Sequence, residues 1–190
     1  MVEQLIKTLN AGGIAVMPTD TMYGLVARAL DKTAVERVYL VKNRSPKKPC
    51  IVLLSSRDDL AKLGVVLEGR TAEIINALWP GPVSMILNID APGFEYLHRG
   101  LGTLAFRLPA NERLQRILAA TGPLIAPSAN PESFPPATTI EAAQRYFHDA
   151  VDYYEDGGVR ENVPSTLIAI EHGTVRIVRQ GSAQIPKEFL

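Results

Sequence analysis

The chain has 190 residues with 20 basic and 20 acidic side chains, and 46% of its residues are hydrophobic. This length suits one packed domain, which we expect to cover residues 1–190. The zero net charge argues against a general nucleic-acid-binding protein, although it allows a local basic patch. The single cysteine cannot form an intrachain disulfide, and the sequence shows neither a signal-peptide pattern nor an apolar run of about 20 residues. We therefore expect a cytoplasmic protein without a membrane partner.

Hydrophobic spacing, caps and breakers divide the chain into helices and strands. The expected elements, in chain order, are a helix at 2–9, a strand at 14–17, a helix at 32–42 capped by Asp31, a strand at 50–56, helices at 58–63 and 71–78, strands at 83–89 and 103–109, a helix at 111–120, a strand at 123–127, a helix at 140–147, and strands at 152–156, 165–171 and 174–180. The last two strands form a hairpin that turns at His172 and Gly173. Alternating strands and helices with a closing hairpin predict an α/β fold with a mixed sheet.

Several common catalytic signatures are absent from the sequence. It contains no GxxxxGK[ST] phosphate loop, no GxGxxG dinucleotide turn, no GxSxG nucleophile elbow and no HExxH zinc motif. Its three histidines are scattered and its cysteine is alone, so we expect no metal bound by the protein itself. The remaining candidates are polar residues near the ends of predicted elements, and each also has a structural explanation.

Two such candidates lie in the first third of the chain. Thr19, Asp20 and Thr21 follow a buried strand, where α/β folds place ligand contacts, but such residues also form Asx turns and helix caps. A cluster of cations at a helix end follows, namely Lys42, Arg44, Lys47 and Lys48. The cluster suits a triphosphate, or a solvated basic turn stabilised by the helix dipole. Taken alone, each candidate is better explained structurally.

Three further cationic or hydroxyl side chains lie at strand ends. Arg107 ends an otherwise apolar strand and needs a partner, either a ligand carboxylate or a structural Asp or Glu. Ser165 opens a later strand and Arg179 closes the next one. The hairpin would bring both to the same end of the sheet, although a strand-entry serine and a surface arginine need no ligand.

Residues 126–136, APSANPESFPP, contain four prolines and therefore form neither a helix interior nor a central strand. The prolines lower the entropic cost of holding Ser128 and Asn130 in place. Their hydroxyl and carboxamide, with nearby backbone N–H groups, suit phosphate or adenine recognition. A polyproline-II surface loop would need no ligand, and spacing alone leaves both interpretations open.

The order of the motifs resembles that of the YrdC-like family of threonylcarbamoyl-AMP synthases, in its short bacterial form. The matching motifs, in chain order, are PTDTMYGL, KNR with a following proline, WPGPVSMIL, AFRLP, PSAN, DGG, PSTLI and RQG. They extend from about Gly12 to Gly181. Each motif is weak by itself, whereas the ordered set is specific.

The resemblance implies a twisted α/β sheet around a deep basic cavity. It implies a nucleotidyltransferase that makes threonylcarbamoyl-AMP and pyrophosphate from L-threonine, bicarbonate and ATP, after which other enzymes modify the adenosine beside the tRNA anticodon. The threonine contacts that it implies are Thr21, Arg107, Ala126 and Ser165. The ATP contacts that it implies are Lys42, Arg44, Lys48, Thr103, Ser128, Asn130 and Arg179.

This implied chemistry needs no protein nucleophile, because a carbamate formed from threonine and bicarbonate attacks the α-phosphate. Positioning and charge neutralisation can therefore supply most of the catalysis. We expect Mg²⁺ to be held by the triphosphate and water, and we expect no tightly bound cofactor. Our hypothesis is that Lys42 and Arg44 neutralise the triphosphate while Arg107 fixes the amino acid.

The chain departs from this family at two places. Many relatives have a Ser-Gly pair where it has Glu132-Ser133, and some longer relatives have a threonine-contacting histidine at the position of Leu53. Losing the glycine stiffens the loop. Glu132 puts an anion near the expected phosphate site, where it weakens nucleotide binding unless the carboxylate points to solvent.

The resemblance also allows other functions. Some relatives bind double-stranded RNA or assist ribosome maturation through the same cavity, and the zero net charge counts mildly against that role here. Related modules bind carbamoyl-adenylate within hydrogenase maturation proteins, but those are much larger chains with zinc-finger cysteines. RNA binding therefore remains the main alternative.

Overall fold

The computed structural model describes residues 2–161, 163–171 and 173–190, and strands of the described chain join into one mixed sheet. The strands are β1 (Ala15–Pro18), β2 (Tyr23–Arg28), β3 (Val52–Leu53), β4 (Val83–Asn88), β5 (Thr103–Arg107), β6 (Leu124–Ile125), β7 (Tyr153–Tyr154), β8 (Thr166–Glu171) and β9 (Thr174–Arg179). Their order across the sheet is β7-β1-β2-β6-β3-β5-β4-β8-β9. The pairs β1–β7, β3–β5 and β4–β8 are parallel and the other pairs are antiparallel, which confirms the predicted mixed sheet.

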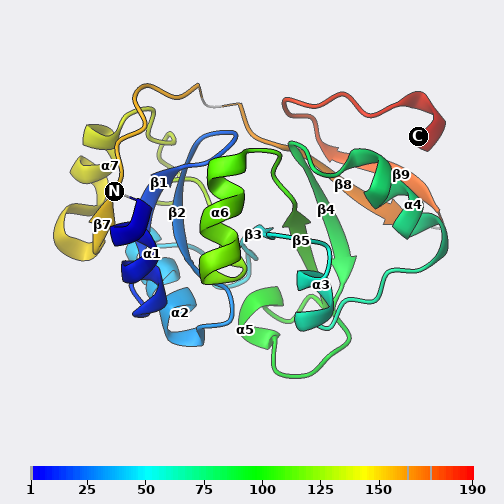
Figure 1. The fold of residues 1–190 in the computed structure, drawn as a ribbon, viewed down its shortest axis with the longest axis horizontal. Helices are drawn as coiled ribbons and strands as arrows, with labels where there is room; N and C mark the ends of the chain where they lie inside the picture. The colour runs from blue at the N-terminus through cyan, green and yellow to red at the C-terminus, as the bar shows by residue number, and fades with distance from the viewer. Residues whose placement is uncertain (1, 162, 172) are drawn as a thin grey trace.

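The helices flank this sheet (Figure 1). They are α1 (Val2–Asn10), α2 (Lys32–Lys42), α3 (Asp59–Lys62), α4 (Gly69–Leu78), α5 (Glu95–His98), α6 (Glu112–Thr121) and α7 (Ile140–Phe147), with short 3₁₀ turns η1 (His148–Ala150) and η2 (Lys187–Phe189). The predicted Asp31 cap is present, since Asp31 accepts from the Ala34 N–H, and Thr139 caps α7 by accepting from the Ala142 N–H. None of the described helices is long and apolar enough to cross a membrane.

The sequence did not predict β2 or α5. β2 is buried along nearly its whole length, so it lacks the alternation that marks a half-buried strand. Thr19 closes the turn that leads into β2, because its hydroxyl donates to the Met22 carbonyl at 2.7 Å. The final hairpin pairs β8 with β9 as predicted, but the proposed turn residue His172 lies outside the described residues.

The two halves of the sheet are covered differently. Around β1 and β2, helices cover both faces: Met17 packs with Leu5 and Leu118 of α1 and α6, whereas Val16 belongs to the cluster that includes α2 and α7. Around β4, β5 and β8, one face buries apolar residues such as Met85 against α4 and the opposite face lines a cavity. The candidate site lies on this cavity-lining face of the sheet.

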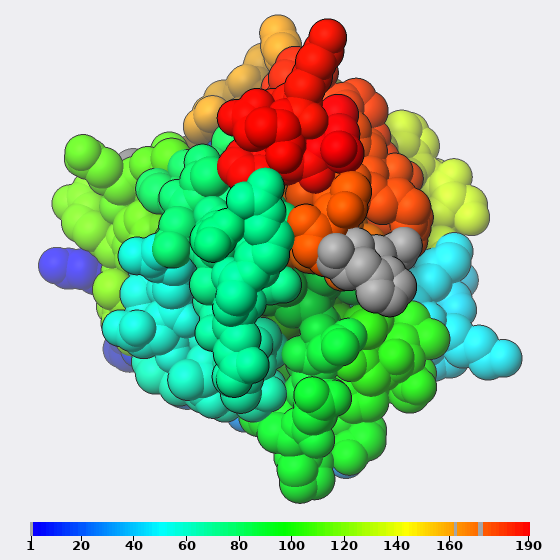
Figure 2. Space-filling view, turned by 90° about the vertical axis from the view of Figure 1, so that its right-hand side faces the viewer, coloured from blue at the N-terminus to red at the C-terminus, as the bar shows by residue number. Residues whose placement is uncertain are grey.

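The C-terminal segment closes one side of the molecule beyond β9 (Figure 2). Ile185 is buried in the main hydrophobic cluster, and the Phe189 ring lies 5.5 Å from the Arg70 guanidinium of α4. The segment therefore packs onto the helix-covered face and leaves the cavity-lining face of the sheet free.

Candidate active site

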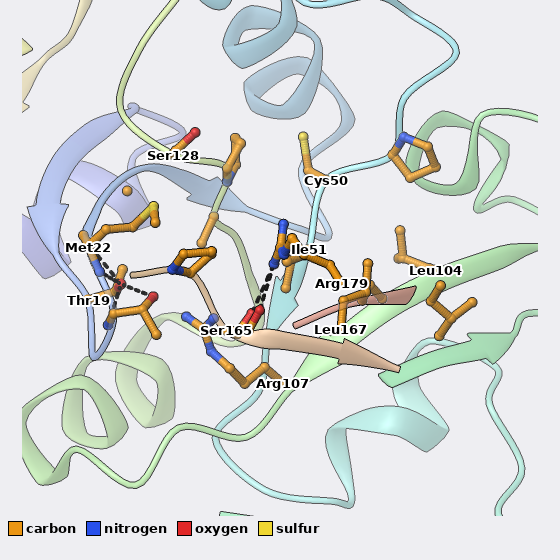
Figure 3. A pocket seen from close by; sticks show the side chains of 18 of the residues that line it. Thr19, Met22, Cys50, Ile51, Leu104, Arg107, Ser128, Ser165, Leu167 and Arg179 are labelled. Carbon is orange, nitrogen blue, oxygen red and sulfur yellow. Dashed lines mark hydrogen bonds between the residues drawn. The ribbon is translucent and has the colours of Figure 1, made fainter. Parts of the chain in front are cut away.

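A cavity of about 550 Å³ lies on the free face of β4, β5 and β8 (Figure 3). Its volume is typical of a small-molecule site. Many of the site residues expected from the sequence line it, namely Thr21, Arg44, Thr103, Arg107, Ala126, Ser128, Ser165 and Arg179. Segments far apart in the chain thus contribute to one cavity, whose wall contains three arginines among the described residues.

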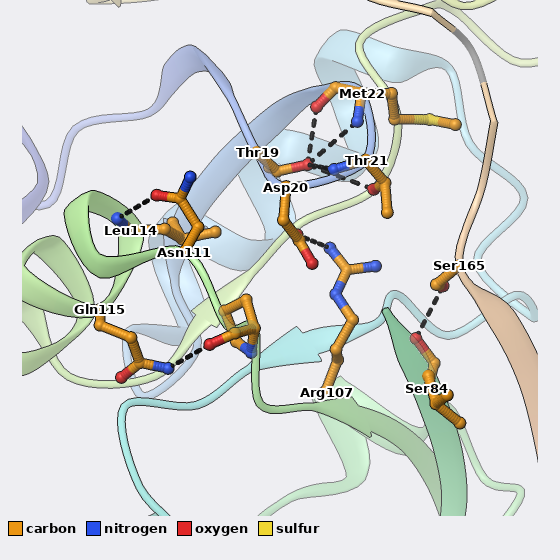
Figure 4. Close-up of polar contacts among 12 residues, drawn as sticks. Thr19, Asp20, Thr21, Met22, Ser84, Arg107, Asn111, Leu114, Gln115 and Ser165 are labelled. Atoms are coloured by element: carbon orange, nitrogen blue, oxygen red, sulfur yellow. Dashed lines mark hydrogen bonds and ion pairs between the residues drawn. The ribbon is translucent and has the colours of Figure 1, made fainter. Parts of the chain in front are cut away.

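Arg107 is buried at the wall of this cavity, with 4% of its surface exposed. One terminal nitrogen lies 2.9 Å from Asp20 Oδ1, and Figure 4 shows the guanidinium between Asp20 and Ser165. The sequence left open whether Arg107 pairs with a ligand carboxylate or with an Asp or Glu of the chain itself. In the structure its partner is the carboxylate of Asp20. Nevertheless, Arg107 Nε has no hydrogen-bond partner within the described chain, so the guanidinium keeps donor capacity. Burial lowers the pKa of Arg107, and Asp20 opposes that shift.

Ser165 and Arg179 meet at one end of the sheet, as the hairpin predicted. Arg179 Nη2 donates to the Ser165 carbonyl at 2.9 Å, and Ser165 Oγ lies 2.8 Å from Ser84 Oγ. Gly181 permits this arrangement, because a Cβ there would lie 2.3 Å from the Pro164 carbonyl oxygen. Burial lowers the pKa of Arg179.

Lys42 is not among the residues that line the cavity, although the resemblance implies that it contacts ATP. Its ammonium is buried and donates to the Ser128 carbonyl at 2.5 Å and to the Asn130 carbonyl. Burial, with a smaller effect from Arg44, lowers the pKa of Lys42 to about 8. Lys42 therefore stabilises the Ser-Ala-Asn loop through its backbone carbonyls.

Asn130 also lies outside the cavity lining, because its carboxamide is used within its own loop. Its Oδ1 accepts from Ser128 Oγ at 2.5 Å, and its Nδ2 donates to the carbonyls of Pro131 and Phe134 at 2.9 and 2.7 Å. These bonds fix the loop so that Ser128 lines the cavity. Ala126 lines it as well, but its N–H already donates to the Ile51 carbonyl at 2.9 Å.

The cavity also has an apolar wall that the sequence did not single out. Its members include Pro49, Cys50, Ile51, Ile86, Leu101, Leu104 and Leu167. Ile86 and Leu167 share a face with Ala105 and Ser84 through strand pairing, so the pleat of β4 and β8 would have indicated them once the pairing was known. An apolar wall opposite arginines suits a ligand with an anionic part and a flat or apolar part.

Comparison with known proteins identifies the family. The sequence profile of the Sua5/YciO/YrdC family, described as "Telomere recombination", matches residues 7–181. The chain belongs to the Sua5/YciO/YrdC family. This match confirms the resemblance that the order of the motifs indicated.

Members of the Sua5/YciO/YrdC family resemble the chain in sequence and in structure. A putative threonylcarbamoyl-AMP synthase of Mycobacterium tuberculosis is 33% identical over 178 residues, covering 93% of this chain and 82% of that protein. The structure of Pyrococcus abyssi Sua5 complexed with L-threonine superposes with a TM-score of 0.86 at 28% identity, covering 95% of this chain and 54% of that one. Escherichia coli YciO, at 24% identity and a TM-score of 0.85, shares the fold over the whole chain. This chain thus spans about half of the archaeal Sua5 protein.

Glu132, at which the sequence analysis noted a departure from the family pattern, does not point freely to solvent. Its carboxylate accepts from the Ser45 N–H at 2.5 Å and forms an ion pair with Lys48, so it is neither free in solvent nor an unpaired anion in the cavity. The Lys48 ammonium and the Ser45 N–H lower the pKa of Glu132. Lys48 itself does not line the cavity.

Ser133 has a backbone conformation that favours glycine. Its φ is +72°, in the left-handed region that costs an L-residue about 1 kcal/mol or more. We predict that Ser133→Gly raises the free energy of unfolding by about 0.5 to 1 kcal/mol, after the greater unfolded-state entropy of glycine is subtracted. Chemical denaturation measures this change. Ser182→Gly is the control, because Ser182 is also exposed but has no positive φ, and this variant is expected to be less stable.

Proposed function

We propose that this chain is an L-threonylcarbamoyladenylate synthase, a nucleotidyltransferase that uses L-threonine, bicarbonate and ATP. The observation that carries the proposal is the convergence of Arg44, Arg107 and Arg179 on one cavity that also has an apolar wall. Such a cavity can neutralise two anionic substrates and still accommodate an adenine base. The family membership and the name of the M. tuberculosis relative support the same activity.

In this proposal, Arg107 binds the threonine carboxylate with the donors that Asp20 leaves free, and Thr21, Ser165 and the backbone at Ala126 complete the amino-acid site. The L-threonine named in the P. abyssi Sua5 complex supports threonine as a substrate. Arg44 and Arg179 neutralise the triphosphate, and Ser128 and Thr103 contact the nucleotide. Lys42 and Asn130 act indirectly, by shaping the loop that carries Ser128.

The proposed reaction has two bond-forming steps. The threonine amine attacks the carbon of bicarbonate and water is lost, which gives a carbamate. A carbamate oxygen then attacks the α-phosphorus of ATP, and the bond to pyrophosphate breaks. The arginines stabilise the charge that develops on the phosphate oxygens, so positioning and electrostatics supply the catalysis.

Mg²⁺ would enter this site with its substrate. The described residues contain no group of three or more His, Cys, Asp or Glu side chains able to hold a metal ion. The triphosphate oxygens and water would therefore supply the ligands of Mg²⁺, which commonly keeps several waters in nucleotide sites. The product would pass to enzymes that modify tRNA beside the anticodon.

The RNA-binding alternative is not favoured by these features. The arginines line a cavity of about 550 Å³, whereas double-stranded RNA is recognised across its minor groove over many base pairs. Arg107 in particular is buried and is inaccessible to a duplex.

The deciding experiment is pyrophosphate release from ATP with and without L-threonine and bicarbonate. We expect release that requires both, together with formation of threonylcarbamoyl-AMP detected by mass spectrometry. Release that is independent of both substrates would refute the synthase. Salt-sensitive RNA binding in the absence of such turnover would support the alternative instead.

A further inference from the structure

Glu132 joins two walls of the cavity. One wall is the basic loop, residues 43–49, which carries Arg44 and Pro49, and the other is the Ser-Ala-Asn segment, which carries Ser128. The Glu132 carboxylate binds the Ser45 N–H at 2.5 Å and the Lys48 ammonium, while the Glu132 N–H donates to the Lys42 carbonyl at 2.8 Å. Glu132 therefore contacts the basic loop at two points, Ser45 and Lys48, and the end of α2 at a third, Lys42.

The position of Arg44 depends on the same loop. Arg44 Nε donates to the Lys48 carbonyl at 3.0 Å, and Nη2 donates to the Pro49 carbonyl at 2.9 Å. The Tyr39 hydroxyl also donates to the Lys48 carbonyl, at 2.8 Å. The carbonyl of Lys48 thus orients Arg44, and its ammonium ties the loop to Glu132.

We propose that Glu132 is a positioning residue that holds the basic loop closed and fixes Arg44 for the triphosphate, and that Lys48 serves this contact instead of binding the nucleotide. The identity of the ligand rests on the proposed function, whereas the closure of the loop does not. A loop that is closed before the ligand arrives spares part of the ordering entropy of binding. A serine side chain in place of Glu132 would neither reach as far nor carry a charge.

Two explanations of Lys48 predict opposite effects of removing Glu132. If Glu132 positions the loop, its loss leaves Arg44 less ordered and raises KM for ATP. If Lys48 is instead a phosphate ligand that Glu132 partly neutralises, the loss of Glu132 frees the ammonium and lowers KM for ATP. The sign of the change therefore separates the explanations.

The experiment compares Glu132→Ala, Lys48→Met and the double variant with the wild-type chain, using ATP-dependent pyrophosphate release. We expect each single variant to raise KM for ATP about five- to tenfold, and the double variant to be no worse than either, because both remove one interaction. The KM for threonine and kcat should change less than twofold. Glu132→Gln, which keeps an acceptor for the Ser45 N–H, should have an intermediate KM for ATP.

The matched control is Lys47→Met, which removes an equal charge from the same loop but from a side chain without an ion pair or hydrogen bond in the described structure. It should leave KM for ATP within twofold. A lower KM for ATP in Glu132→Ala, or additive effects in the double variant, would overturn the proposal.

Amide hydrogen exchange in the ligand-free proteins tests the closed loop separately from catalysis. Exchange across residues 43–49, above all at the Ser45 amide, should be faster in Glu132→Ala and Lys48→Met than in wild type and Lys47→Met. Unchanged exchange would overturn the loop-closing role. If wild type released no pyrophosphate, the proposed function would fail, and the exchange result would still decide the role of Glu132.

Discussion

Arg107→Met is expected to lower kcat/KM for threonine by about two to three orders of magnitude. A buried charge-assisted contact to a substrate carboxylate is worth about 3–4 kcal/mol, which corresponds to this loss. The same change leaves the Asp20 carboxylate without its cation, so it is also expected to destabilise the fold by about 3 kcal/mol. Threonine-dependent pyrophosphate release and chemical denaturation measure the two effects.

The control for Arg107 is Arg113→Met. Arg113 also forms an ion pair with a largely buried carboxylate, that of Glu155, but it does not line the cavity. We expect a comparable loss of stability and unchanged kinetic constants at a temperature where both variants are folded. Equal losses of activity in the two variants would show that Arg107 acts through stability alone.

Lys42→Met is expected to lower the free energy of unfolding by about 2 kcal/mol and to raise KM for ATP. Methionine fills the space but leaves the Asn130 carbonyl without its donor and the Ser128 carbonyl with only the Asn130 N–H, which outweighs the relief of a buried charge. The loosened loop then positions Ser128 less well for the nucleotide. Lys32→Met, at the exposed start of the same helix, should change stability by no more than about 0.5 kcal/mol.

The pH dependence provides a second test of Lys42. Its pKa in the folded chain is about 8, below the ordinary value of 10.5. Between these values the unfolded chain binds more protons than the folded one, so the contribution of Lys42 to stability rises with pH. The stability difference between wild type and Lys42→Met should therefore widen from about pH 8 toward pH 10.5 and stay constant below about pH 7. A difference that narrowed over this range would contradict the buried, easily deprotonated amine.

The local sequence pattern was sufficient to predict much of the architecture. The predicted strand at 103–109 has a period of two, which by itself puts Thr103, Ala105 and Arg107 on one face, and all three line the cavity. The hairpin placed Ser165 beside Arg179 because hairpin neighbours are close in sequence. These features depend on the pleat and on short connections, which the sequence encodes directly.

The motif order contributed information of another kind. It indicated which polar residues belong together and pointed to the Sua5/YciO/YrdC family, whose profile covers residues 7–181. It could not indicate which of those residues would line the cavity and which would support the others. Lys42, Lys48 and Asn130 were grouped with the cavity residues although they lie outside its lining.

The sequence by itself thus determined the mixed α/β sheet, the strand-end candidates and the family. Only the tertiary structure decided that Lys42 turns inward to a carbonyl 86 residues away and that Glu132 binds Lys48 across 84 residues. Such contacts follow from how distant segments pack, and neither periodicity nor turn chemistry encodes them. β2 escaped prediction for a related reason, since burial on both faces is a property of the whole sheet and removes the local alternation.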